Sequence, residues 1–343
     1  MLKKIIGAAL ALSIIIVLAG CAAGGGGATP GGAAAPGGAA GAGGGGAATQ
    51  LRLSHNAPDG HVYDQAAHMF AELVYERTSG RYEIIIFPNN QLGSPVEVAE
   101  AVMLGNIDFT ITSDDMLVAY APEFGALGMP FLFDDFDHVY NTVNGPVGEY
   151  LDGLLRQSGI AIAGWFENGF RHITNSRGPI YTPDDIAGLR MRVLTSPPAI
   201  DFMDEAGASV ISIAIGELYI ALQLGTADAQ ENPLHNIRDR GFYEVQDYLS
   251  MIGYMHTVQP LIMSMATYNR MSPEDREIIM AAGREASTFS FEIAERVDAE
   301  NLEYLRGQMN VNEADRESFM VLADLIWERN REEFGRIIDM IRE

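Results

Sequence analysis

Two arginines in one short stretch are spaced for display on the same side of a β-strand. In the sequence GLRMRV, residues 188–193, Arg190 and Arg192 alternate with Leu, Met and Val. Successive side chains of a strand point to opposite faces, so one face is apolar and the other carries both guanidinium groups. A guanidinium presents a planar fork of donors that fits a carboxylate. The stretch indicates an anion site, unless the arginines pair with nearby acids such as Asp184, Asp185 and Asp204.

Two further stretches combine residue types that suit a small polar ligand. The sequence WFENGFRH, residues 165–172, holds Trp165, Phe170 and Arg171, and AQENP, residues 229–233, holds Asn232 at the end of an expected strand. Open α/β sheets place ligands at such strand ends. Amides bond to hydroxyl and carbonyl oxygens, and aromatic rings cover apolar or sugar-ring surfaces. The alternative interpretation is core packing for the aromatics and turn formation for the asparagine before proline.

These residues would be positioned by alternating strands and helices. The periodicity predicts strand 51–55, helix 60–78, strand 82–87 and strand 107–112. The first three form a βαβ unit, which implies a parallel sheet with a right-handed crossover. Serine or threonine followed by proline marks three helix starts, at Ser94, Thr182 and Ser272. The last of these opens a long helical region.

A spaced pattern occurs twice in the chain. The first copy consists of Glu97, Ala101, Leu104, Gly105 and Asp108, and the second of Glu217, Ala221, Leu224, Gly225 and Asp228. Both copies read as a helix that a glycine ends, followed by a strand that starts near the aspartate. We therefore expect two related α/β lobes, with a cleft between them in which a ligand binds.

Composition excludes several classes of protein. The 343 residues carry a formal net charge of -24, whereas a nucleic-acid binder needs a basic stripe, so nucleic acid is excluded as a partner. Cys21 is the only cysteine, which rules out a disulfide and a thiol nucleophile in the folded part. No lysine follows Lys4, which rules out Schiff-base and lysine general-base chemistry. An anion pocket must be built locally, against the acidic field of the chain.

Enzyme and metal motifs are missing from the sequence. It has no G-x-S-x-G elbow, no H-E-x-x-H zinc motif and no Walker loop. His61 and His68 share one helical face, but no further ligand completes a metal site. The acidic runs at 114–115 and 134–137 lack the glycine of a calcium loop and are interpreted as helix starts or solvated turns. We expect no enzyme activity, no metal and no cofactor.

The first residues have the pattern of an export signal. Lys3 and Lys4 precede an apolar run, residues 5–18, so residues 1–20 are predicted to be a lipoprotein signal peptide. The sequence LAGC resembles the lipobox of bacterial lipoproteins, which implies cleavage before Cys21 and a lipid on its sulfur. An ordinary secretory signal is the alternative. Residues 21–49 would then be the lipidated cysteine and a flexible linker rich in Gly and Ala.

Several motifs together resemble a known family. The stretches ENGFRHITNS, TPDDIAGLRMRV, QENPL and FYEVQDYLS, in this order, are similar to the extracytoplasmic solute receptor of tripartite ATP-independent periplasmic (TRAP) transporters, of the dicarboxylate-receptor type. The similarity runs from about Leu51 to near Glu300. It implies an α/β, two-lobed fold like that of periplasmic binding proteins, with a ligand cleft between the lobes and a long C-terminal helical region.

The resemblance also implies how the lobes are built and what they do. Lobe I would comprise residues 51–168 and 258–297, and lobe II residues 169–257 and 298–343. The closed form would deliver an organic acid to the permease subunits of the transporter. The receptor would be an extracytoplasmic monomer, anchored to the cell membrane through its lipid. A sugar-acid-processing enzyme and a sensor input module are the alternatives from other classes.

Residue by residue, the resemblance assigns a carboxylate-binding site. The hallmark arginine, which pairs with the ligand carboxylate, corresponds to Arg192. A second arginine of the family corresponds to Arg171, and the amide of its Q-x-N-P motif to Asn232. A strand-end position that reaches the ligand in some members corresponds to Asn56, with His55 beside it.

Further residues are assigned to the rest of the ligand. Trp165 or Phe170 would cover a ring face, Ser196 and its neighbour Thr195 would add hydroxyl contacts, and Arg190 would lie on the surface. The strand's Arg-Val is followed by Leu, where many members have Pro. The motifs R-V-x-x-S-P and G-E-L-Y resemble the uronate-binding branch more closely, which favours a hexuronate or related sugar acid. A C4-dicarboxylate or a 2-oxo acid is the alternative ligand.

Overall fold

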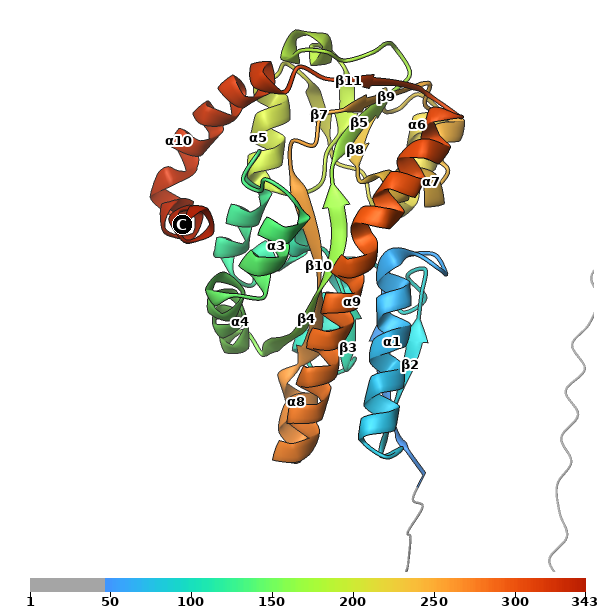
Figure 1. The fold of residues 1–343 in the computed structure, drawn as a ribbon, viewed down its shortest axis with the longest axis vertical. Coiled ribbons are helices and arrows are strands. Elements are labelled where there is room, and N and C mark those ends of the chain that lie inside the picture. Colours follow the sequence, from blue (N-terminus) through green and yellow to red (C-terminus); the bar gives the residue numbers. More distant parts are fainter. Residues whose placement is uncertain (1–46) are drawn as a thin grey trace, which may run out of the picture. The chain divides into compact units, whose positions relative to one another are not determined.

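The computed structural model describes residues 47–343, which build two β-sheets flanked by helices (Figure 1). The predicted signal peptide, Cys21 and most of the linker lie outside the described residues. Within residues 47–343, none of the helices has the length and apolar character needed to cross a membrane. The predicted α/β class is confirmed.

The first sheet has five strands in the order β2-β1-β3-β10-β4. In that order they span Tyr82–Phe87, Thr49–Ser54, Phe109–Ile111, His256–Ser264 and Ile160–Phe170. β1 runs parallel to β2 and β3, as the predicted βαβ unit requires, and β10 runs antiparallel to β3 and β4. The helix of that unit, α1 (Val62–Arg77), buries Phe70, whose ring meets that of Phe109 edge-on at 5.4 Å between centroids.

The second sheet has six strands in the order β11-β9-β5-β8-β6-β7. In that order they span Asn310–Glu313, Tyr248–Met251, His172–Asn175, Ala229–Asn232, Arg190–Arg192 and Ser209–Ile211. β6 runs parallel to β7 and β8, and β5 runs antiparallel to β8 and β9. The order β2-β1-β3-β10-β4 therefore matches β7-β6-β8-β5-β9 in the direction of every neighbouring pair.

The repeated sequence pattern lies at matching places in the two sheets. Gly105 follows α2 (Pro95–Met103) and Gly225 follows α6 (Leu218–Gln223), and both have positive φ, 79° and 66°. The aspartates come directly before β3 and β8. Asp108 accepts the backbone N–H of Arg52 in β1 at 2.9 Å, and Asp228 accepts that of Arg190 in β6 at 3.1 Å. The predicted internal relationship is thus present in the hydrogen bonding.

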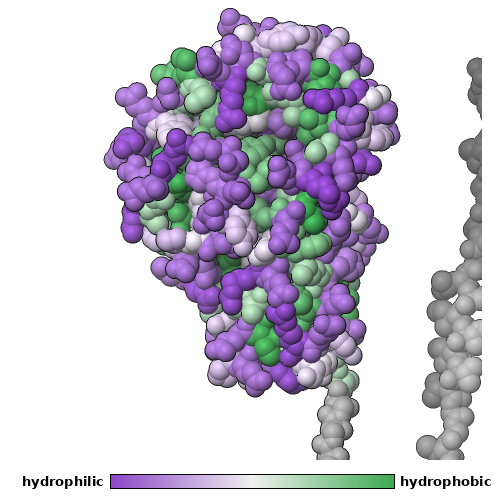
Figure 2. Space-filling view, viewed as in Figure 1, coloured by the Kyte–Doolittle hydropathy of each residue, from purple (hydrophilic) through white to green (hydrophobic). Residues whose placement is uncertain are grey.

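Helices cover both sheets, and the longest of them extends over both. The other α-helices are α3 (Phe136–Val143), α4 (Pro146–Gln157), α5 (Pro197–Glu205), α7 (Leu234–Asp239), α8 (Met265–Arg270), α9 (Pro273–Arg306) and α10 (Arg316–Arg342). α9 packs against strand β4 of the first sheet and strand β11 of the second, and also against the helices α1 and α7. The predicted capping box of Ser94 and Glu97 opens α2, and Ser272 caps α9. Figure 2 shows polar side chains over most of the visible face, as the acidic composition requires.

The chain passes between the sheets at two short connections. β4 ends at Phe170 and β5 begins at His172, so Arg171 alone links them, and its backbone N–H donates to Met255 O in the connection from β9 to β10. These crossings lie near the predicted lobe boundaries at 168/169 and 257/258. The boundary predicted at 297/298 falls inside α9, which is one continuous helix.

Candidate functional site

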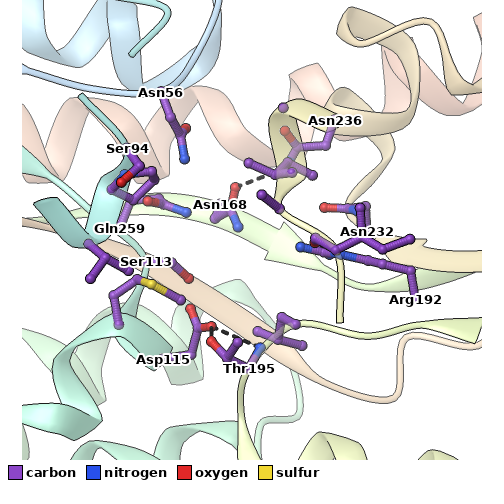
Figure 3. Close-up of a pocket in the computed structure, with 18 of the residues that line it drawn as sticks. Asn56, Ser94, Ser113, Asp115, Asn168, Arg192, Thr195, Asn232, Asn236 and Gln259 are labelled. Atoms are coloured by element: carbon purple, nitrogen blue, oxygen red, sulfur yellow. Dashed lines mark hydrogen bonds between the residues drawn. The ribbon is translucent and has the colours of Figure 1, made fainter. Parts of the chain in front are cut away.

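A cavity of about 430 Å³ is lined by segments of both sheets (Figure 3). It lies where the parallel strands end, because each of β1, β3, β6, β7 and β8 ends at or just before a lining residue. In strand order these residues are Asn56, Ser113, Arg192, Ser212 and Asn232. The carboxyl ends of the strands in two similarly built sheets thus meet at one hollow, which is where open α/β sheets bind ligands.

Arg192 contributes a buried and uncompensated charge to this cavity. The residue is 7% exposed, and its Nε donates to Ile213 O at 3.0 Å. Within residues 47–343, its two Nη nitrogens have no hydrogen-bond partner and no carboxylate lies within ion-pair distance. Burial lowers the pKa of Arg192, and the nearby Glu231 carboxylate offsets only part of that effect. The guanidinium therefore presents free donors to the cavity.

Arg190 has a different environment although it lies on the same face of the same strand. Its Nε and Nη2 donate to Asp228 at 3.0 and 2.6 Å, and its side chain is half exposed. β6 has only three residues, so Arg190 lies at its amino end near solvent and Arg192 at its carboxyl end beside the cavity. The prediction that Arg190 lies on the surface is confirmed. Its acidic partner is Asp228, which was not among the acids that the sequence suggested as partners.

Arg171 lines the cavity but is already engaged. Its Nε and Nη2 donate to the two carboxylate oxygens of Glu231, the second at 3.1 Å, and Nη2 also donates to Glu231 O at 2.7 Å. Burial alone would lower the pKa of Arg171, but the Glu231 carboxylate outweighs it and the pKa is raised. A ligand would meet a neutral pair here and not a second free cation.

The two predicted asparagines line the cavity from opposite sheets. Asn232 donates to Gln230 Oε1 at 2.5 Å, which leaves its amide oxygen free. Asn56 Oδ1 accepts from Tyr63 Oη at 2.7 Å and from Arg240 Nη2 at 3.4 Å, which leaves its amide N–H groups free. Figure 3 shows Asn232 on the side of Arg192 and Asn56 across the hollow.

The two predicted ring-covering residues lie outside the cavity wall. Trp165 is 5% exposed and stacks on Phe124 at 6.0 Å between centroids. Phe170 packs edge-on against His256 at 4.8 Å and against Phe136 at 5.4 Å. Neither ring is among the residues that line the cavity and both make core contacts, so ligand covering by Trp165 or Phe170 stays a prediction.

His55 and Ser196 are also set back from the cavity. His55 is 2% exposed, its Nε2 bonds to Asp64 Oδ1 at 3.1 Å, and its Nδ1 accepts the N–H of Ala57. Ser196 is 2% exposed at the start of α5, and its hydroxyl packs against Gly128. The neighbouring residues Asn56 and Thr195 line the cavity, and ligand contacts by His55 and Ser196 stay predictions.

Several polar residues of the cavity were not among the predicted site residues. They include Ser113, Asp115, Asn168, Asn236, Arg240 and Gln259. Ser113 and Asp115 directly follow the strand predicted at 107–112, so the strand-end rule would have found them. The acidic run 114–115 does open a short helix, η1 (Asp114–Ala119), which is one of its two predicted interpretations, and Asp115 in its first turn is only 9% exposed. Within residues 47–343, no three His, Cys, Asp or Glu side chains form a metal-binding cluster.

This fold and cavity define a class of protein, the α/β solute-binding proteins whose site lies at strand ends of two similar sheets. Residues 53–333 match the family described as bacterial extracellular solute-binding protein, family 7. The chain belongs to this family of TRAP transporter receptors, as the resemblance predicted. The family binds organic acids outside the cytoplasm for transport and is not an enzyme family.

Two relatives illustrate the similarity in sequence. The chain is 36% identical over 291 residues to an uncharacterized protein of Sinorhizobium fredii, a match that covers 84% of this chain and 54% of that protein. The chain thus spans about half the length of this relative. It is 32% identical over 243 residues to the 2,3-diketo-L-gulonate-binding periplasmic protein of Escherichia coli, covering 71% of this chain and 74% of that one.

Solved structures confirm the predicted two-lobed fold. A TRAP periplasmic solute-binding protein from Polaromonas sp. JS666, bound to D-erythronate, is 32% identical with a TM-score of 0.83, over 85% of this chain and 98% of that one. Another, from Sulfurospirillum deleyianum with bound succinate, is 26% identical with a TM-score of 0.81, over 85% and 98% of the two chains.

Proposed function

We propose that the chain binds a hexuronate or a related sugar acid and delivers it to the permease subunits of a TRAP transporter. The observation that carries the proposal is the Arg192 guanidinium, buried at the cavity wall with two nitrogens uncommitted. A ligand carboxylate would supply the missing partner in a two-pronged contact. Such a charge-assisted bond contributes about 1.5–3 kcal/mol net.

Amide groups would bind the rest of the ligand. Asn232 has a free amide oxygen and Asn56 has free N–H groups, which together suit the hydroxyls of a sugar acid. Arg171 would act mainly by holding the wall in place, since Glu231 neutralises its charge and accepts from its Nε and Nη2. Contacts to residues of both sheets favour a closed form, in proportion to the difference in affinity between the two forms.

The alternative ligand is a C4-dicarboxylate or a 2-oxo acid. Related receptors were solved or named with succinate and with 2,3-diketo-L-gulonate, so the family accommodates such acids. All these candidates share the carboxylate that Arg192 would bind. They differ in what the opposite wall of the cavity must accept.

We propose that each of the two sheets forms the centre of one lobe. We also propose that a lipid on Cys21 anchors the receptor to the membrane. The support is the lipobox-like sequence LAGC and the Gly/Ala-rich stretch that follows it. Replacing Cys21 with Ser should release the protein from the membrane fraction of the cells that make it. A variant that stays membrane-bound would contradict the anchor.

The function is tested by a thermal-shift screen of organic acids followed by calorimetric titration. A ligand that binds only the native protein raises its melting temperature, so the screen covers hexuronates, aldonates, C4-dicarboxylates and 2-oxo acids. Arg192→Ala should lower the affinity for the best acid of the screen by about 10- to 100-fold. Arg190→Ala is the matched control from the same strand and should bind as the native chain does. Unchanged affinity in Arg192→Ala would reject the proposed role.

A further inference from the structure

The charged residues of the cavity can be sorted by what already pairs with them. Those that line it are Arg171, Arg192, Arg240 and Asp115. Arg171 is neutralised by Glu231. Arg192 meets only a backbone carbonyl, Ile213 O. Arg192 therefore contributes one unmatched positive charge to the cavity. The net charge that a ligand experiences then depends on the other two residues, Arg240 and Asp115.

Arg240 follows α7 and makes contacts only with neutral groups. Its Nε donates to Asn236 Oδ1 at 3.0 Å, and its Nη2 donates to Asn56 O at 3.3 Å and to Asn56 Oδ1 at 3.4 Å. Within the described part of the chain, no carboxylate lies within ion-pair distance of it. Arg240 thus leaves a second unmatched positive charge at the cavity.

Asp115 is the single acid among the lining residues. Its Oδ2 accepts from Thr195 N at 3.2 Å and from Thr195 Oγ1 at 2.6 Å, so its orientation is fixed from the second sheet. Its Oδ1 has no partner within residues 47–343. Figure 3 shows Asp115 and Ser113 together on one side of the hollow, with Arg192 entering from the other side.

Two unmatched guanidinium groups and one carboxylate leave the cavity with a single net positive charge. One ligand carboxylate on Arg192 balances that charge. A second carboxylate at the far end would approach Asp115, and two carboxylates at short distance repel each other. A hydroxyl in the same position would instead donate to Asp115 Oδ1.

We propose that Asp115 is a specificity-determining residue that makes the site select a polyhydroxylated acid with one carboxylate over the dicarboxylate of the same carbon chain. The carboxylate of the ligand lies on Arg192, and a hydroxyl from its other end lies on Asp115. Ser113, Asn168 and Gln259 bind neighbouring hydroxyls on the same side. This inference rests on the proposed function and decides between its alternative ligands.

The test uses pairs of acids that differ only at the terminal carbon. Erythronate and meso-tartrate form the four-carbon pair, and galactonate and galactarate the six-carbon pair. Calorimetric titration of the native chain should show at least tenfold tighter binding of the monocarboxylate in the pair that fits. Asp115→Asn should bring the two acids within about threefold of each other, mainly by tighter binding of the dicarboxylate.

Controls separate this inference from the function on which it rests. Asp201→Asn removes an exposed carboxylate from α5 and should leave the preference as it is. Asp115→Ser is a second variant in case Asp115→Asn does not fold, and retained binding of the monocarboxylate shows that a variant is folded. A native chain that prefers the dicarboxylate overturns the inference alone. So does a preference unchanged in both Asp115 variants while Arg192→Ala weakens binding as expected. If no acid of these pairs and no acid of the wider screen binds, the proposed function falls with it.

Discussion

Arg171 and Glu231 form a buried two-pronged ion pair at the point where the chain crosses from the first sheet to the second. Their side chains are 4% and 0% exposed. The Glu231 carboxylate also accepts from Tyr254 Oη and from the N–H of Leu194, both at 3.1 Å. Leu194 lies two residues beyond Arg192, so one carboxylate fixes both the crossing and the strand end that carries the free arginine.

Breaking this ion pair should destabilise the protein strongly. Glu231→Gln leaves the Arg171 guanidinium buried without a counter-charge, and such losses cost about 3–5 kcal/mol. We expect a large fall in the midpoint of urea unfolding, measured without ligand. Arg190→Gln, which removes the half-exposed Arg190 from its pair with Asp228, is the control and should shift the midpoint little, since Arg177 still pairs with Asp228. Equal shifts in the two variants would show that the buried pair has no special structural role.

The two glycines of the repeat offer a matched comparison of backbone strain and space. Gly105 and Gly225 both have positive φ, so alanine costs about 1–2 kcal/mol at either position. A Cβ at Gly105 would also come within 2.9 Å of Ala266 Cβ, whereas a Cβ at Gly225 would meet nothing within 4 Å. Gly105→Ala should therefore lower the free energy of unfolding more than Gly225→Ala does, as measured by denaturant titration. The reverse order would mean that the two turns are not equivalent.

Asp298 on α9 should make stability depend on pH. Burial, with the Glu167 carboxylate as a further cause, raises its pKa to about 7, above the usual 3.8. A raised pKa in the folded state means that the folded protein binds the proton more tightly. The resulting stabilisation is complete below about pH 4 and is lost as the pH rises through 7. Asp114, with a pKa also raised to about 7 by burial and by Asp115, titrates in the same window.

Comparison with a neutral variant isolates the contribution of Asp298. Asp298→Asn cannot ionise, so it should melt above the native chain at pH 8, by roughly 2 °C per kcal/mol for a chain of this size. At pH 5 the folded protein keeps Asp298 protonated and only the unfolded chain ionises it, so the gap in melting temperature should be smaller than at pH 8. Melting curves at the two pH values check this. A gap that does not change with pH would exclude ionisation of Asp298 as its cause.

Local chemistry allowed much of the fold to be predicted from the sequence. The capping box at Ser94, the serine cap at Ser272 and the strand 82–87 depend on neighbouring residues only, and each is present in the structure. The repeat was visible because the helix end, its glycine and the aspartate before the strand recur at fixed spacing. Asp108 and Asp228 then perform the same task, holding the N–H of the adjacent strand.

Pairings between distant segments could not be predicted in the same way. Arg190 and Arg192 lie on the same face of β6. Only the short length of β6 and the position of Asp228 explain why Arg190 is at the surface and Arg192 is buried. Neutralisation of Arg171 requires Glu231 from a strand far along the chain. Trp165 and Phe170 have the composition of a ligand-covering pair, but their core partners are distant in sequence and decide their position.

The free guanidinium of Arg192 should cost the ligand-free protein stability. A buried charge without a counter-charge is unfavourable, and a functional site retains it because the ligand supplies the partner. Arg192→Met keeps the length of the side chain and removes the charge, so it should raise the melting temperature in the absence of ligand while it weakens binding of the acid about as much as Arg192→Ala does. Arg192→Lys keeps a charge but loses the planar fork, so it should weaken binding by about tenfold or more without that gain in stability. Differential scanning calorimetry with and without the best acid from the screen checks both effects. If Arg192→Met melts below the native chain without ligand, the guanidinium is stabilised by contacts within the protein and is not held ready for a carboxylate.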